Sequence, residues 1–267
     1  MKMGVSSILC FERTIEECFK FATDFINIEH LDIFCCPPHC DLNAGDRSWL
    51  CIKEKLIDFG VSSSIKAPSF VENLISINRD IRELTFNEYA ECIKIASKIE
   101  ADAVIIKAGM MFYPEKRFSV FLKKDFIEKM SKLLDYAKEH EVFLLLENYY
   151  YPYEILREPR DFEEMNKLFC YSDFFGFALN IPHLLESGFS VEFLSKKRTI
   201  ADRIIQVYVG LRPSPWELHN NPKSEVEILT ETKKLLKYVS PRFVVIATRS
   251  LNVLKKFAEK FGWSGFR

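Results

Sequence analysis

Short apolar runs alternate along the whole chain with longer segments in which apolar residues recur at helical spacing. The short runs are apolar throughout, which is typical of parallel strands buried on both faces. We predict eight strands, at Lys2–Ser6, His30–Phe34, Val61–Lys66, Ala103–Lys107, Val142–Glu147, Phe175–Asn180, Ile204–Val209 and Phe243–Ile246.

A helical segment follows each predicted strand. Thr14 and Glu17 form a capping-box pattern at the start of the first helix, and Asp161 is the predicted cap of a later one. The predicted helices span about 14–25, 48–58, 87–98, 123–140, 161–169, 191–195, 224–238 and 251–261. Eight strand–helix units in 267 residues predict an α/β protein, a single (β/α)8 TIM barrel over residues 1–267, since such barrels need about 250 residues.

Five of these strands carry a polar or ionisable residue at or next to the end: Lys66, Lys107, Glu147, Asn180 and Tyr208. The carboxyl ends of all strands in a TIM barrel converge on one mouth, where such barrels place their active sites. We therefore expect these five side chains to lie together and to mark any functional site.

The composition argues against nucleic-acid-binding and membrane-spanning classes of protein. The formal net charge is −1, so no overall basic field favours nucleic acid. No apolar stretch approaches the roughly 20 residues of a membrane span, and no signal-peptide pattern is visible. We expect a cytoplasmic protein. The single glutamine, Gln206, among abundant lysine and glutamate resembles a thermophile-like composition.

Three of the eight cysteines crowd the end of the second strand, in the segment 35–40 with sequence CCPPHC. Cys35, Cys36, His39 and Cys40 suggest zinc, but a second Cys-x-x-Cys pair is absent from the sequence. Reduced thiols are the alternative. The pattern leaves both open.

Four of the strand ends carry motifs that resemble one known family. These are Ile65-Lys66-Ala67-Pro68 with Asn73-Leu74-Ile75-Ser76, Val104-Ile105-Ile106-Lys107-Ala108-Gly109, Leu144-Leu145-Leu146-Glu147-Asn148, and Phe177-Ala178-Leu179-Asn180-Ile181-Pro182-His183. They are similar to the third- to sixth-strand motifs of the xylose isomerase-like TIM barrel superfamily. That superfamily contains sugar phosphate isomerases and epimerases and the apurinic/apyrimidinic endonucleases of DNA repair.

The resemblance implies a divergent member with a degenerate metal site. Members commonly hold divalent metal with Glu, Asp, His and Glu on strands five to eight, and the endonucleases add histidines on strands three and four. Here only Glu147 is kept, and the other positions carry Lys66, Lys107, Asn180, Tyr208 and Ala247. An ammonium group has no lone pair for a metal and repels a dication. We therefore expect no cofactor.

A reduced metal site is the alternative that the same resemblance offers. His183 is kept, and Glu217 and His219 resemble the Asp-x-His pair that completes a third metal site in the endonucleases. Two imidazoles and a carboxylate would suit a single zinc or manganese ion. That version would be a metal-dependent sugar isomerase or a phosphodiester hydrolase.

The two lysines admit several roles. Lys66, Lys107 and Glu147 are the candidate catalytic residues, and Asn180, Tyr208 and Arg212 the candidate ligand contacts. The lysines could form a structural ion-pair cluster with Glu147, bind a small anionic or sugar-like molecule, or act as a base or Schiff-base nucleophile. A barrel that acts without catalysis through a protein partner is a further possibility.

Overall fold

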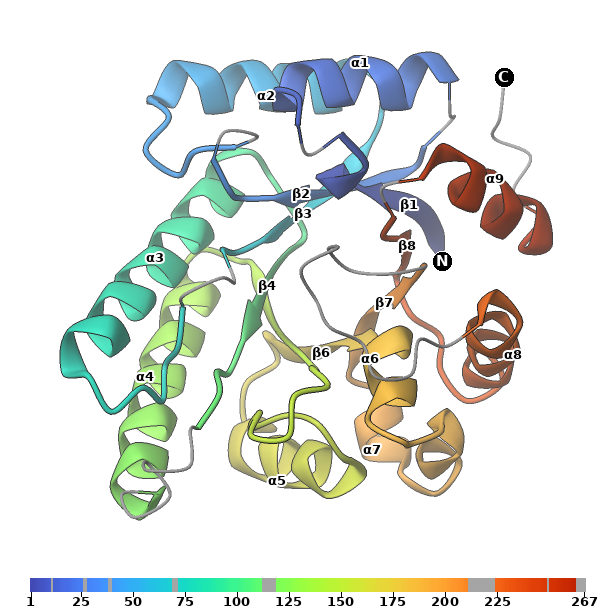
Figure 1. Ribbon diagram of the computed structural model, residues 1–267. Helices are drawn as coiled ribbons and strands as arrows, with labels where there is room; N and C mark the ends of the chain where they lie inside the picture. Colours follow the sequence, from blue (N-terminus) through green and yellow to red (C-terminus); the bar gives the residue numbers. More distant parts are fainter. Residues whose placement is uncertain are drawn as a thin grey trace.

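The computed structural model describes residues 1–10, 12–25, 28–37, 40–68, 72–111, 119–210, 224–248 and 250–262. Eight parallel strands close into one barrel in chain order, and the helices lie outside this ring (Figure 1). The strands are β1 (Lys2–Ser6), β2 (His30–Phe34), β3 (Ser62–Lys66), β4 (Ala103–Lys107), β5 (Phe143–Glu147), β6 (Phe175–Asn180), β7 (Ile204–Val209) and β8 (Phe243–Ile246). The predicted (β/α)8 fold is confirmed, and every predicted strand agrees within one residue.

The helices that follow the strands cover the outside of the barrel. They are α1 (Ile15–Phe25), α2 (Asp46–Asp58), α3 (Arg79–Lys98), α4 (Ser119–Glu139), α5 (Pro159–Phe169), α6 (Ile181–Glu186), α7 (Arg198–Ala201), α8 (Glu225–Leu235) and α9 (Leu251–Lys260). Among these described helices, none is long and apolar enough to cross a membrane.

Local capping chemistry explains where the helix predictions differ from the structure. Helix α3 begins eight residues before the predicted Asn87, because the Asn78 side chain accepts a hydrogen bond from the Asp80 amide at 2.9 Å. Asp161 is not the cap of α5: it is the third helical residue, and its carboxylate accepts from the amide of the true cap, Glu158, at 2.8 Å. The predicted helix at 191–195 is a 3-10 helix, Val191–Lys196. The pattern gave no signal for the short helices α6 and α7.

Buried polar groups cluster on one side of the barrel interior. Ser6, Asp32 and Ser64 are buried on the first three strands and hydrogen-bond to one another. A small apolar cluster in the interior includes Ile105 and Leu145, and Tyr208 belongs to this cluster while its hydroxyl bonds Asp32. The polar side therefore concentrates electrostatic interactions directly beneath the ends of β2 and β3.

Gly109 allows two of the strand-end loops to meet. Its φ is +113°, and a Cβ there would lie 2.2 Å from the side-chain oxygen of Asn73. The Asn73 amide donates to the Met110 carbonyl at 2.7 Å. Any larger residue at position 109 would push the loop after β3 away from the loop after β4.

Candidate functional site at the barrel mouth

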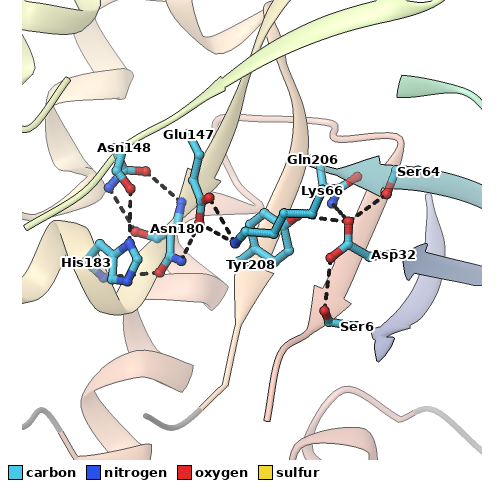
Figure 2. A network of polar contacts seen from close by, with 10 residues as sticks. All are labelled: Ser6, Asp32, Ser64, Lys66, Glu147, Asn148, Asn180, His183, Gln206 and Tyr208. Atoms are coloured by element: carbon cyan, nitrogen blue, oxygen red, sulfur yellow. Dashed lines mark hydrogen bonds and ion pairs between the residues drawn. The ribbon is translucent and has the colours of Figure 1, made fainter. Parts of the chain in front are cut away.

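Lys66 and Glu147 form the central contact of the mouth. In the strand register, Lys66 on β3 pairs with Ile105 on β4, and Lys107 on β4 pairs with Glu147 on β5. Lys66 therefore starts one inward-facing layer below Lys107 and Glu147. The Lys66 side chain nevertheless passes β4 and reaches β5, where its Nζ lies 2.9 Å from both Oε1 and Oε2 of Glu147 (Figure 2). The Glu147 side chain is fully buried, and that of Lys66 is 17% exposed. This is a buried ion pair, in which the loss of either partner leaves an uncompensated charge.

Asn180 also donates a hydrogen bond to the Glu147 carboxylate. Its Nδ2 donates to Oε1 of Glu147 at 2.9 Å. Asn148 fixes the ends of β5 and β6 by two reciprocal bonds, accepting from the Asn180 amide at 2.7 Å and donating to the Asn180 carbonyl at 3.1 Å. The structure thus brings together three of the predicted site residues, Lys66, Glu147 and Asn180.

Tyr208 presents its ring, and not its hydroxyl, to the lysine. The Lys66 ammonium lies 4.4 Å from the ring centroid, a cation–π contact. The Tyr208 hydroxyl points the other way and donates to Oδ1 of the buried Asp32 at 2.9 Å. Burial and the neighbouring Asp32 and Glu147 charges raise the pKa of Tyr208 well above its usual value.

Lys107 lies over a second aromatic face, with its Nζ 3.5 Å from the ring centroid of Tyr149. The tyrosines after β5 pack on one another: the ring centroids of Tyr150 and Tyr151 are 4.4 Å apart, and those of Tyr149 and Tyr150 are 4.8 Å apart. Tyr149 therefore holds Lys107 at the rim of the mouth, next to the Lys66–Glu147 pair.

Glu147 is stabilised as an anion despite its burial. Burial by itself raises the pKa of this carboxyl group, but the charges of Lys66 and Lys107 and the hydrogen bond from Asn180 outweigh it. The pKa falls to about 2. Glu147 is thus ionised at neutral pH and serves as a fixed negative charge.

Glu154 is a residue of the mouth that sequence reasoning missed. It lies in the loop after β5, where Met110 and Glu154 form an antiparallel bridge, and its carboxyl group is close enough to Lys107 and Glu147 for their charges to act on it. Burial is the main reason that its pKa rises to about 7, with Glu147 adding to the rise and Lys107 opposing it. The available signal was that Glu154 follows Glu147 by seven residues, in the loop at the same end of the barrel. Nothing in the sequence pattern showed that this loop folds back toward Met110.

Of the three predicted metal ligands, only His183 lies within the described residues. His183 is buried on α6, and its Nδ1 lies 3.0 Å from the Asn148 carbonyl. Burial lowers the pKa of His183 to about 3, so that the ring is neutral. Glu217, His219 and the candidate ligand contact Arg212 lie outside the described residues.

The donor set at the mouth does not fit the metal centre of the family. The Lys66 ammonium and the Asn180 amide both donate to Oε1 of Glu147. Oε2 lies 2.9 Å from the same ammonium but accepts no hydrogen bond, and the Tyr208 hydroxyl is directed at Asp32. Within the described part of the chain, no group of three or more His, Cys, Asp or Glu side chains is arranged to hold a metal.

The cysteines at the end of β2 are close to one another. The sulfur atoms of Cys35 and Cys40 are 3.8 Å apart and buried, and all eight cysteines are free thiols. Burial and the neighbouring charges raise the pKa of Cys36, which does not favour the thiolate that binds zinc. His39 lies outside the described residues.

Comparison with known proteins agrees with this architecture. Among solved structures, a D-tagatose 3-epimerase-like protein superposes with a TM-score of 0.78 at 18% identity, covering 98% of this chain and 96% of that one. A D-allulose 3-epimerase from Methylomonas sp. in complex with D-allulose gives 0.69 at 13% identity, covering 100% and 91%. The 3-keto-D-glucoside 4-epimerase YcjR from E. coli gives 0.70 at 11% identity, covering 98% of each chain. Such low identities establish the fold alone. No curated protein sequence matches this chain.

The fold and the polar strand ends define the class: a TIM barrel with its candidate site at the carboxyl ends of the strands. A family model described as xylose isomerase-like TIM barrel matches residues 26–226. The chain belongs to this family, and the resemblance inferred from its motifs is confirmed.

Proposed function

We propose that this protein binds a small sugar-like molecule, anionic or polyhydroxylated, at the barrel mouth without a divalent metal. The observation that carries the proposal is the contact of the Lys66 ammonium with both oxygens of Glu147. The chain's own cation occupies the carboxylate that the family commonly gives to a metal ion. A second cation at the same carboxylate would be repelled by Lys66 and Lys107.

The kind of ligand follows from the groups around that pair. Lys107 provides an ammonium donor at the rim, and Glu154 provides a carboxyl group that changes its protonation state near neutral pH. Hydroxyl and carbonyl groups of a sugar are suited to such mixed donors and acceptors. Two solved neighbours, a D-psicose 3-epimerase from Clostridium cellulolyticum H10 with D-tagatose and the D-allulose 3-epimerase with D-allulose, support a sugar-like ligand for this fold.

The chain's own residues define what the site can do chemically. Glu147 and Lys66 provide fixed charges of opposite sign, which can orient a polar ligand and stabilise charge that develops on it. Glu154, with a pKa of about 7, is matched to donate or accept a proton at neutral pH. Proton transfer on a sugar-like ligand is therefore the chemistry that this site is best equipped to assist.

Calorimetry on chelator-treated protein tests the proposal. We expect D-tagatose, D-allulose or their phosphate esters to bind, and Lys107→Met to weaken that binding by about tenfold, the effect of losing one charge-assisted hydrogen bond. Lys94→Met is the matched control, because Lys94 lies on the outer helix α3 and pairs there with the exposed Glu91. Binding that appears only after zinc or manganese is restored would refute metal independence, and no binding under either condition would refute a sugar ligand.

A single-metal site around His183 is the second candidate, and one observation favours it. The Asn148 carbonyl accepts from Nδ1 of His183, which leaves Nε2 as the nitrogen with a lone pair, the arrangement common to metal-binding histidines. Glu217 and His219 would supply the other ligands. Elemental analysis of the unaltered protein and of the His183→Ala variant tests this site. About one equivalent of zinc or manganese in the unaltered protein, and its loss in the variant, would establish it.

The phosphodiester-hydrolase version has its own test. Phosphate contacts strengthen at low salt, so an enzyme of this kind should bind abasic-site DNA most strongly there. Absence of binding at low salt would exclude it.

A further inference from the structure

Asp32 is a buried carboxylate directly beneath the mouth, and the function proposed above does not use it. It is completely buried on β2. Four side chains of β1, β3 and β7 direct donors at it: Ser6 lies 3.0 Å from Oδ2, while Ser64, Tyr208 and Gln206 lie 2.8, 2.9 and 3.3 Å from Oδ1 (Figure 2).

The four donors around Asp32 are suited to its ionised form. An ionised carboxylate only accepts hydrogen bonds, and each of the four neighbours can donate one. Burial has the largest effect and raises the pKa of Asp32 above its usual value, and the charge of Lys66 is the strongest of the opposing effects. A buried anion is stable only when a cation compensates it, and Lys66 is the strongest compensating charge.

Tyr208 links the two charged residues physically. Its hydroxyl binds Asp32 below, and its ring face lies against the Lys66 ammonium above. Asp32 is also level with Ser64, two residues before Lys66 on β3. Asp32 and Lys66 are therefore on adjacent strands, and Tyr208 contacts both of them.

We propose that Asp32 is a positioning residue that acts as the second counter-ion of Lys66 and, through Tyr208, holds its ammonium group against Glu147. Lys66 then has a carboxylate on each side, Asp32 below it and Glu147 at the mouth. Lys66 then acts as a fixed cation, held in place from both sides.

The reactivity of Lys66 in the ligand-free protein tests this role, and does so independently of whether any sugar binds. Each lysine would be acylated at one mildly alkaline pH and quantified by peptide mass spectrometry, with exposed Lys94 as the reference in the same sample. Asp32→Asn removes one negative charge and with it one counter-ion of the ammonium group, so we expect the Lys66-to-Lys94 rate ratio to rise about tenfold. Ser6→Ala removes a hydrogen bond to Asp32 but leaves its charge, and we expect the ratio to stay unchanged.

Two outcomes would overturn the proposal. An unchanged ratio in Asp32→Asn would reduce Asp32 to a structural residue, and an equal rise in Ser6→Ala would indicate loosening of the barrel in place of a charge effect. If Asp32→Asn does not fold, the carboxyl carbon shift of Asp32 in the unaltered protein decides by NMR at neutral pH: an ionised group is expected, and a protonated one would refute the counter-ion role.

Discussion

Lys66 on β3 binds Glu147 on β5 across the intervening strand, with its Nζ 2.9 Å from each carboxylate oxygen. Lys107, the direct neighbour of Glu147 in the β4–β5 register, lies instead over the Tyr149 ring. Lys66 reaches Glu147 from one layer below, because the lysine side chain is long enough to span that distance.

Truncation of Lys66 should strongly destabilise the fold. Lys66→Ala leaves the Glu147 charge buried and uncompensated, which costs about 3–5 kcal/mol in comparable pairs. Chemical denaturation measures the loss. The double variant Lys66→Met/Glu147→Leu should recover much of it, because it removes both charges, and equal stability of the single and double variants would show that the pair is not coupled.

Stability should fall in acid because of Glu147. Its pKa is lowered to about 2 in the folded protein against about 4.3 in an unfolded chain. The stabilisation is therefore fully present above about pH 5 and is lost as the pH falls through 4 toward 2. Denaturation at several pH values should show this loss in the wild type and a much smaller one in Glu147→Gln.

Glu154 should give the opposite pH dependence. Its folded pKa of about 7 is above the unfolded value, so the folded state binds the proton more tightly. Its contribution to stability is favourable at low pH and is lost as the pH rises from about 4 through 7. Glu154→Gln cannot ionise and should remove this part of the profile, and a variant that titrates like the wild type between pH 5 and 8 would assign the change to another group.

Asn180→Asp should destabilise the mouth although it restores the residue type common in the family. The change replaces the amide that donates to Glu147 at 2.9 Å with a second carboxylate. Loss of the bond and like-charge repulsion should cost about 1–3 kcal/mol at neutral pH. Thermal unfolding would measure it, and the cost should shrink in acid. An increase in stability on adding zinc or manganese to this variant alone would show that Lys66 does not exclude a metal.

The sequence predicted some of the residues around Glu147 and missed others. The residues Lys66, Glu147 and Asn180 were recognisable because each ends a parallel strand, and the barrel brings such ends together. The roles of Asp32 and Glu154 were not recognisable. Asp32 lies in mid-strand, where nothing local distinguishes it, and Glu154 reaches the mouth only because its loop bridges to Met110.

The sequence by itself determined the eight-stranded barrel, its family and the ring of polar residues at its mouth, because strand periodicity and strand ends are local properties of the chain. The tertiary structure decided which of those residues touch. Barrel register sets Lys66 one layer below Lys107, and the Tyr208 hydroxyl bonds Asp32. The Lys66 ammonium compensates the buried charge of Glu147, because an unpaired charge is costly in a low-dielectric interior.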